Sequence, residues 1–376
     1  MTIANSSINP PLVFEVAKTA LNKTRIIPLN IERALSDNEV LLKVDKFALT
    51  ANNISYGITG DTLGYWRFFP TEIPSEQAQW GRLPVMGFAD VVSSNCPHIK
   101  VGERVWGFMP MATHVKILAG RISATRFSDI SSCRAGLSPL YSSFDRVQNN
   151  PFYQAKNEDY DILLRGLFTT AWLVDDYMFD HHYFKAQQYL ITSASSKTSI
   201  ALAFAIQQRG ERTAVGITSE ANRDFVNSLG IYQQVVSYNQ ISSLDPNIGS
   251  ILVDMAGGQK TLSSIHHHFA DQLYYSCQIG ATQHEDIDIN DTLFFDKLPG
   301  VKPTFFFAPS QLKKRSIDWG ADKTMTQINN ALLSYIQYCQ SLITIKQTKD
   351  VNQVDAIYQQ VLAGSADASV GQIISL

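Results

Sequence analysis

Short apolar segments separated by polar turns dominate the first third of the chain. Residues 39–50 have the pattern of a strand that follows a turn at 36–38, and residues 87–94 have the pattern of another. A turn at residues 101–102 returns the chain to the sheet, and residues 113–118 form a further strand. Several short strands joined by turns are typical of a small barrel. The pattern therefore predicts a mostly β domain at the start of the chain.

From about residue 160, segments with helical spacing alternate with short apolar strands. Helical patterns cover 162–178, 198–208, 220–229 and 259–269, and apolar strands cover 188–192, 213–218, 235–236, 250–254 and 273–279. This alternation predicts right-handed crossovers and a parallel sheet with helices on both faces. Residues 305–307 would extend that sheet. Two more helices, 324–342 and 351–363, and a last strand at 371–376 end the chain.

The composition is that of an ordinary globular protein with two domains. The chain has 376 residues, which is long for a single core, and its formal charge of -3 argues against a nucleic-acid partner. No apolar run approaches about 20 residues, so we expect no membrane partner. Residues 1–11 do not resemble a secretory signal. Four widely spaced cysteines are typical of free thiols in a reducing compartment, and we expect a cytoplasmic protein.

Three segments occur in an order that is typical of one large enzyme superfamily. They are Lys100–Phe108 (KVGERVWGF), Ile251–Gly258 (ILVDMAGG) and Ala366–Leu376 (ADASVGQIISL). In this order and spacing they resemble the medium-chain dehydrogenase/reductase superfamily, especially its zinc-free, quinone-oxidoreductase-like branch. Residues 51–57, 65–70 and 306–320 are similar to a poorly characterised offshoot of that superfamily.

The resemblance implies a fold, domain boundaries and an assembly. It implies an α/β chain with a Rossmann-type, doubly wound parallel-sheet domain at 158–310. A GroES-like β-barrel domain would be formed by residues 1–157 and 311–376. Zinc-free relatives pair through the edge strand of the nucleotide domain, so residues 305–307 are a candidate homodimer contact.

The positions that hold zinc in relatives carry no suitable ligands here. Where zinc-dependent members have Gly-His-Glu, this chain has Gly87-Phe88-Ala89, and it has no cysteine in residues 50–56. Phenylalanine and alanine cannot ligate a metal, so we expect no zinc. The run His266–His268 is also a poor metal site, because consecutive helical residues point about 100° apart. A solvated helix face is the simpler interpretation, and the same holds for the pair at 181–182.

The turn between the strand at 188–192 and the following helix is where a dinucleotide fold binds phosphate. The usual glycines are missing, and the candidate phosphate ligands are Ser193, Ser195, Ser196, Lys197 and Thr198. Serine is small and its hydroxyl can donate to phosphate, and the helix N-terminus supplies free amides. The lysine would either pair with a phosphate or occupy its place. Two outcomes therefore remain open, a dinucleotide site or a ligand-free fold.

The end of the second strand favours NADPH over NADH. Thr218 and Ser219 are neutral donors, and Arg223 follows about one helical turn later, a set that suits a 2′-phosphate. Glu220 would reverse the preference if it faced the ribose. Ser276 and Gly280 lie at the carboxyl end of another strand, where open sheets bind ligands. The basic run at 313–315 would reach the cofactor phosphates or form a solvated turn.

By the same resemblance, Asn53 and Tyr56 would face the nicotinamide, with Tyr56 the better donor to a substrate oxygen. A tyrosine with its ring in the core is the competing interpretation. Tyr65 and Trp66 would line or cover the substrate cleft, or pack in the core.

Three functions fit these residues. The first is an NADPH-dependent, zinc-independent oxidoreductase that reduces a quinone, an enone or a related small conjugated carbonyl. The second is a non-catalytic, dehydrogenase-like protein that binds or senses a ligand, and the third is an enoyl-thioester reductase.

Overall fold

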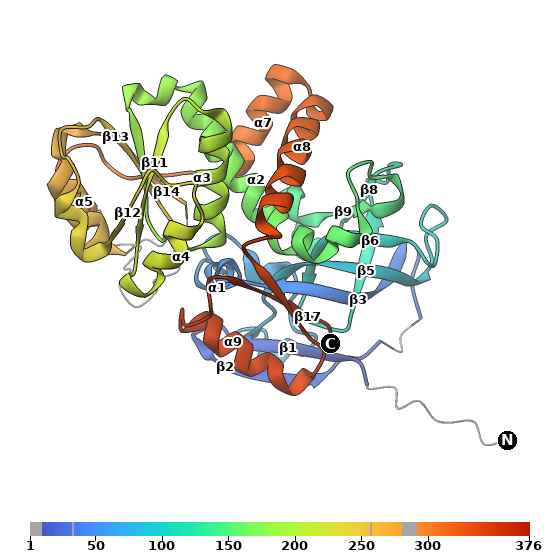
Figure 1. Ribbon diagram of the computed structural model, residues 1–376. Coiled ribbons are helices and arrows are strands. Elements are labelled where there is room, and N and C mark those ends of the chain that lie inside the picture. Colours follow the sequence, from blue (N-terminus) through green and yellow to red (C-terminus); the bar gives the residue numbers. More distant parts are fainter. Residues whose placement is uncertain (1–9, 32–33, 256–257, 280–291) are drawn as a thin grey trace. The chain divides into compact units, whose positions relative to one another are not determined.

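The computed structural model (Figure 1) describes residues 10–31, 34–255, 258–279 and 292–376. Contacts within the chain divide it into two compact units. We call the first the barrel unit; it consists of Met1–Tyr153, Lys346–Ser365 and Gln372–Leu376. We call the second the parallel-sheet unit; it consists of Gln154–Ile345 and Ala366–Gly371. Each unit is described by itself.

The barrel unit contains a closed, antiparallel, six-stranded barrel. In spatial order its strands are β3 (Glu39–Leu49), β5 (Pro84–Ser94), β6 (Arg104–Pro110), β9 (Ser143–Arg146), β8 (Arg126–Asp129) and β7 (His114–Gly120). The barrel closes because β7 pairs with β3 along Glu39–Lys43. Inward residues such as Val40, Leu42 and Phe88 are wholly buried. The predicted barrel and its GroES-like class are confirmed.

The same unit carries a small sheet that the sequence pattern did not resolve, together with the helix predicted at 351–363 and the last strand predicted at 371–376. A separate three-stranded sheet is formed by β2 (Ala20–Pro28), β1 (Leu12–Ala17) and β4 (Trp80–Gly81). Helix α9 (Val354–Leu362) packs on β2, where the Tyr358 hydroxyl donates to the Leu21 carbonyl at 2.9 Å. The last strand, β17 (Val370–Ile374), pairs with β3.

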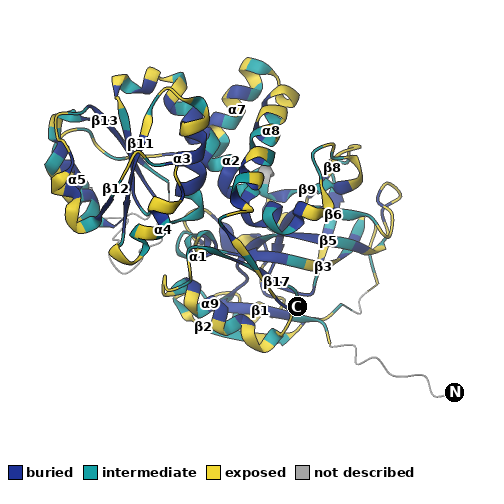
Figure 2. Ribbon diagram, viewed as in Figure 1, coloured by how far each residue is buried: buried dark blue, intermediate teal, exposed yellow. Residues whose placement is uncertain are grey.

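The parallel-sheet unit is built on a six-stranded, wholly parallel sheet. In spatial order its strands are β12 (Gln234–Ser237), β11 (Thr213–Thr218), β10 (Gln188–Ile191), β13 (Ser250–Asp254), β14 (Leu273–Gln278) and β15 (Thr304–Phe305). Helices α3 (Lys197–Arg209) and α5 (Gln259–Phe269) lie on opposite faces of this sheet (Figure 1). Strand β13 is buried along its whole length (Figure 2). The predicted Rossmann-type, doubly wound sheet is confirmed.

Two helical patterns differ from the prediction. The segment predicted as one helix over 220–229 is a short 3-10 turn, Glu220–Asn222, followed by α4 (Arg223–Ser228). The segment before 324 was not predicted to be helical, yet α7 (Ala308–Trp319) precedes α8 (Ala321–Cys339). Gly320, with φ of 90°, separates the two helices, a conformation that glycine adopts without steric cost.

The contacts divide the chain at other boundaries than those predicted. Residues 311–345 group with the parallel-sheet unit, whereas the resemblance implied that they belong to the barrel domain. The physical reason is that α7 and α8 pack against the long helix α2 (Glu158–Asp180) of the parallel-sheet unit. Only the later part of the tail returns to the barrel unit. Among the described residues, no helix is both long and apolar enough to cross a membrane.

Candidate phosphate site and neighbouring residues

The turn between β10 and α3, which we call the phosphate loop (residues 192–199), folds without glycine. Ser193 takes the left-handed region with φ of 48°, which costs a residue with a side chain some strain. Its amide donates to the Tyr238 hydroxyl at 3.2 Å. At the base of the loop the buried Thr192 hydroxyl donates to Asp254 Oδ1 at 2.7 Å. Side-chain contacts therefore hold a bend that glycine usually makes.

Serine side chains start the helix that follows. Ser196 is the N-cap residue of α3, and its Oγ accepts from the Ser199 amide at 3.2 Å. The buried Ser199 hydroxyl donates to the Thr192 carbonyl at 2.9 Å and so closes the loop on itself. Capping satisfies one of the amides that a helix start leaves without a partner. Ser196 thus has a structural role in the loop.

Three amides of the loop keep their hydrogen-bonding capacity. Within the described part of the chain, no acceptor is bound to the N–H groups of Ser195, Lys197 and Thr198. They lie at the N-terminus of α3, a helix of 13 residues, where the aligned peptide dipoles add partial positive charge. Such a group of amides is suited to a phosphate. The free amides and the positive helix end are the features from which the sequence analysis predicted a phosphate site at this turn.

The side chain of Lys197 is bound to another segment of the same unit. Its Nζ donates to the Ala368 carbonyl at 3.3 Å, in the segment before β17. Burial among neighbouring groups lowers the pKa of this ammonium to about 8. The Lys197 ammonium therefore lies on the Ala368 carbonyl, and this contact does not support the alternative in which the ammonium takes the place of a phosphate.

Two predicted residues and one that was missed meet beside the loop. Thr218 is buried, and its hydroxyl lies 3.5 Å from Ser195 Oγ, which also accepts from Asn222 Nδ2 at 3.1 Å. Ser219 is half-buried and its side chain makes no capping bond, although it occupies the N-cap position. Arg223 pairs with the exposed Glu220 at 3.2 Å. The side chains of Ser195, Thr218 and Asn222 therefore form a neutral, polar corner next to the loop. The nearby Glu220–Arg223 pair carries no net charge.

Ser276 lies in the core of its unit. It is wholly buried, and its Oγ lies 3.0 Å from His266 Nε2. His266 is also wholly buried, and its Nδ1 contacts the Pro299 carbonyl at 3.1 Å. The predicted solvated face for residues 266–268 is therefore wrong at His266, because the middle of an amphipathic helix turns one side chain in three or four to the core. Gly280 lies outside the described residues.

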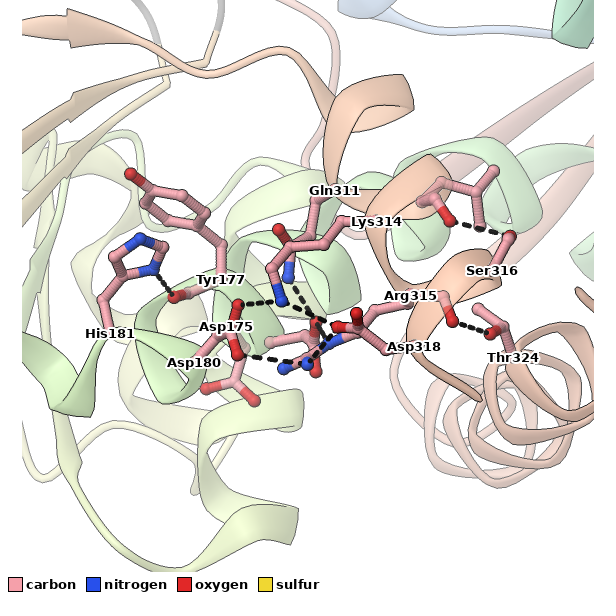
Figure 3. Close-up of polar contacts among 12 residues, drawn as sticks. Asp175, Tyr177, Asp180, His181, Gln311, Lys314, Arg315, Ser316, Asp318 and Thr324 are labelled. Atoms are coloured by element: carbon pink, nitrogen blue, oxygen red, sulfur yellow. Dashed lines mark hydrogen bonds and ion pairs between the residues drawn. The ribbon is translucent and has the colours of Figure 1, made fainter. Parts of the chain in front are cut away.

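The basic run at 313–315 binds acidic residues of its own unit. Arg315 is buried and pairs with Asp176 at 2.6 Å, Asp180 at 3.1 Å and Asp318 at 3.2 Å. Lys314, which lies on the same helix as Arg315, pairs with Asp180 and Asp318 (Figure 3). We call the set Asp176, Asp180, Gln311, Lys314, Arg315 and Asp318 the α2–α7 clamp. The run lies on a helix and not in a turn. Arg315 is buried because α7 packs on α2, whereas Lys313 and Lys314 are exposed, as the solvated alternative predicted.

The predicted catalytic residues lie in the barrel unit on α1 (Ala51–Ile58). Asn53 is buried and uses both side-chain atoms locally: its Nδ2 donates to the Pro84 carbonyl at 2.9 Å, and its Oδ1 accepts from the Thr50 amide at 2.7 Å. Tyr56 is 8% exposed, and its hydroxyl is hydrogen-bonded to Asn52. Burial raises the pKa of Tyr56 well above its usual value. This phenol therefore stays protonated at physiological pH, so it can donate a hydrogen bond but cannot act as a base.

The residues predicted for the substrate cleft are packed in the barrel unit. The Tyr65 ring lies 4.4 Å from that of Tyr56, centroid to centroid, and its hydroxyl is hydrogen-bonded to Tyr141. Trp66 is 3% exposed and lies against the backbone of Gly60 and Gly81, where even a Cβ would collide with its ring. The core-packing alternative describes Trp66 best. Tyr65 is 8% exposed and keeps a polar edge through its hydroxyl.

The described residues contain no group of three or more histidine, cysteine or acidic side chains placed to hold a metal ion. At the positions where zinc-dependent relatives have ligands, Phe88 and Ala89 are wholly buried barrel residues. Their side chains have no lone pair to offer.

Sequence reasoning missed several polar side chains around the phosphate loop. They are Asn222, Tyr232, Tyr238 and Tyr335. Tyr238 lies two residues after the predicted strand at 235–236, so its place at the carboxyl edge of the sheet was available from the sequence. Tyr335 lies 138 residues after Lys197, and no local pattern relates two residues at that separation.

Taken together, a Rossmann-type sheet and a GroES-like barrel give the chain the fold of the medium-chain dehydrogenase/reductase class. Comparison with family sequences shows that the chain belongs to the family described as "Protein of unknown function (DUF2855)", which matches residues 47–367. No curated protein matches the chain.

Solved structures support the fold at low sequence identity. CurA from Vibrio vulnificus in complex with NADPH has a TM-score of 0.60 and 12% identity, with 94% of each chain covered. A mutant enoyl thioester reductase from Candida tropicalis has a TM-score of 0.56 and 12% identity, with 98% of this chain and 100% of that chain covered. The yhdH oxidoreductase from Salmonella enterica in complex with NADP has a TM-score of 0.53 and 10% identity, with 98% and 99% covered. At such identities the likeness concerns the fold alone.

Proposed function

We propose that this protein is an NADPH-dependent, zinc-independent oxidoreductase that reduces a small conjugated carbonyl compound such as a quinone or an enone. The observation that carries the proposal is the group of three amides at the start of α3 that have no acceptor among the described residues. The first amides of any helix lack an intrahelical partner, and these three belong to half-buried residues, where an anion can reach them. Here they remain available next to a positive helix end.

The residues around the loop fit a dinucleotide. The three amides suit the pyrophosphate, and the neutral corner of Ser195, Thr218 and Asn222 carries no acid that would repel a 2′-phosphate. Glu220 is tied to Arg223, so the acid that would favour NADH has a partner. Two of the similar structures are complexes with NADPH or NADP. These points support NADPH as the cofactor.

The cofactor would supply the hydride, and the chain would supply orientation and hydrogen-bond donors. In the barrel unit the best donor is the Tyr56 hydroxyl, because burial keeps it protonated. A protonated phenol stabilises negative charge that develops on a substrate oxygen. Asn53 supports the same helix by capping it, since its amide and carbonyl groups are already engaged.

A titration tests the cofactor and the activity separately. Purified protein is titrated with NADPH and with NADH while the nucleotide fluorescence is followed, and turnover is then assayed on a panel of quinones, enones and enoyl thioesters. The proposal expects saturable NADPH binding, weaker NADH binding, and turnover on a quinone or an enone. Absence of binding by either nucleotide at high micromolar concentration contradicts it. Turnover of the thioester alone would identify an enoyl-thioester reductase instead.

One observation favours a second candidate, a non-catalytic binding or sensing protein with the same fold. Tyr56 and Tyr65 are each only 8% exposed, and both hydroxyls already have protein partners. NADPH binding without turnover on the whole panel would support this candidate.

The assembly and the cellular location remain proposals. We propose a homodimer formed through the edge of the sheet, because β15 ends the sheet and Phe305 and Phe307 are 55% and 45% exposed. Large apolar side chains at a sheet edge are typical of a covered surface. Sedimentation of the purified chain tests the dimer, and a cytoplasmic location is expected from the free thiols.

A further inference from the structure

Three tyrosine hydroxyls contact the backbone of the phosphate loop from three different places in the parallel-sheet unit. Tyr232 donates to the Ala194 carbonyl at 3.0 Å, and Tyr335 donates to the Lys197 carbonyl at 3.2 Å. Tyr238 accepts from the Ser193 amide at 3.2 Å. Tyr232 lies between α4 and β12, Tyr238 follows β12, and Tyr335 is on α8.

The positions of these contacts are related to the three amides without an acceptor. A trans peptide unit is planar, so its C=O and N–H groups point in opposite directions. The Ala194 carbonyl and the Ser195 amide belong to one peptide unit, and the Lys197 carbonyl and the Thr198 amide belong to another. A hydroxyl that holds the carbonyl therefore also fixes the direction of the amide on the opposite side.

The third amide is oriented by the helix itself. The Lys197 amide shares its peptide unit with the Ser196 carbonyl, which accepts from the Ile200 amide at 2.9 Å. Each of the three available amides thus shares its peptide unit with a carbonyl that is held in place. Tyr232 holds the Ala194 carbonyl, the helix holds the Ser196 carbonyl, and the Lys197 carbonyl receives the Tyr335 hydroxyl in addition to its place in the helix. The loop obtains from side chains the fixed geometry that glycine-rich loops obtain from a tight turn.

The surroundings of two tyrosines show that they are built into the unit. Tyr335 is wholly buried, and its ring lies 5.0 Å from Phe168 of α2 and 5.2 Å from Phe204 of α3. The Tyr232 ring lies against Gly216 of β11, where a Cβ would stand 3.0 Å from the ring and 3.1 Å from Ala194 Cβ. Gly216 therefore leaves the room in which Tyr232 reaches the loop.

We propose that Tyr232 and Tyr335 are positioning residues that aim the Ser195 and Thr198 amides at the phosphates of a dinucleotide. The proposal rests on the proposed function for the identity of the ligand, but the orientation of the peptide units is a property of the chain alone. Neither tyrosine contacts the ligand in this account. Their effect is transmitted through the two peptide units that they hold.

The chain offers a matched control on the same helix. Tyr338 lies three residues after Tyr335, and its hydroxyl also donates to a backbone carbonyl, that of Leu229, at 2.7 Å. Tyr335→Phe and Tyr338→Phe each remove one hydroxyl and keep the ring. A purely structural role would give the two variants similar effects on every measurement.

The first measurement needs no ligand. Backbone hydrogen exchange is followed across residues 193–198 in wild type, Tyr232→Phe, Tyr335→Phe and Tyr338→Phe. We expect faster exchange in this segment for Tyr232→Phe and Tyr335→Phe only. All four proteins should have similar thermal unfolding temperatures. Equal exchange in Tyr335→Phe and Tyr338→Phe overturns the proposal.

The second measurement uses inorganic pyrophosphate and NADPH as probes. Loss of one hydrogen bond of ordinary strength predicts about fivefold to tenfold weaker binding of both probes to Tyr232→Phe and Tyr335→Phe. Binding to Tyr338→Phe stays at the wild-type value. Wild-type binding with no difference among the variants overturns the positioning role and leaves the proposed function intact. Faster loop exchange in a protein that binds neither probe supports the positioning of the loop and contradicts the proposed function.

Discussion

The phosphate loop and the α2–α7 clamp lie in the same unit, and both are rich in polar side chains, but they use them differently. In the clamp, Arg315 faces three carboxylates, and Gln311 donates to Asp176 at 2.7 Å. In the loop, side chains hold the backbone while three amides keep no acceptor among the described residues. The comparison teaches that unused bonding capacity, and not charge, separates a ligand site from a structural contact.

The largest effect is expected at the buried centre of the clamp. Asp176→Ala leaves Arg315 and Gln311 without their shared buried acceptor, and removing one partner of a buried pair costs about 3 kcal/mol of the free energy of unfolding. NADPH affinity of the folded protein should stay at the wild-type value. Denaturant unfolding and nucleotide titration of the same sample check both statements.

Asp318 provides the control for that experiment. It contacts the same arginine at the more exposed rim of the clamp, where water screens the pair. Asp318→Ala should therefore change stability much less than Asp176→Ala. A loss of NADPH affinity in Asp176→Ala at full stability would show that the clamp belongs to the ligand site after all.

A medium effect is expected at Lys197, with opposite signs for stability and binding. The pKa of its ammonium is lowered to about 8, below the usual value near 10.4, so the charged form opposes folding at neutral pH. Lys197→Met should raise the free energy of unfolding by about 1 to 2 kcal/mol at pH 7. The gain should shrink as the pH rises from about 8 towards 10, where the wild type loses the charge.

The same variant should bind NADPH more weakly, because it removes a positive charge from the start of α3. A residue that destabilises the fold and supports binding is typical of a functional site. Lys197→Arg keeps the charge and serves as the control for binding. Lys197→Met that is both less stable and unchanged in NADPH affinity would place this lysine with the structural contacts.

A smaller effect on stability is expected at the buried His266–Ser276 pair. As in the clamp, the polar side chains of this pair are hydrogen-bonded within the protein. Burial lowers the pKa of His266 below its unfolded value of about 6.5. The stability from its neutral form is therefore complete above about pH 6.5 and is lost as the pH falls through the folded pKa. Chemical unfolding between pH 7.5 and 5 should show a decline on the order of 1 kcal/mol. His266→Gln should remove that part of the decline, and an unchanged slope would contradict the assignment.

The fold could be predicted from the sequence to a large extent because it follows from local patterns. Apolar strands such as 188–191 and 250–254 and the helix from 197 to 209 carry their periodicity within a few residues. Helix α7 was missed because Pro309 and the polar residues around it hide its amphipathic pattern, and its partner α2 lies more than 100 residues earlier.

The site could be predicted only where it is local. The loop and its corner with Thr218 follow from the order of strands, since the carboxyl ends of neighbouring parallel strands meet at one edge. The tyrosines 232 and 335 reach the loop through tertiary packing, and Ser276 turns to His266 because of the face on which it lies. No pattern within a short window encodes these contacts.

The most direct test of the central claim is a structure of the protein with bound NADPH. The account predicts that pyrophosphate oxygens accept hydrogen bonds from the Ser195, Lys197 and Thr198 amides, with the Tyr232 and Tyr335 hydroxyls still on the Ala194 and Lys197 carbonyls. A dinucleotide bound elsewhere, or a loop that must abandon these tyrosine contacts to bind it, would contradict the account.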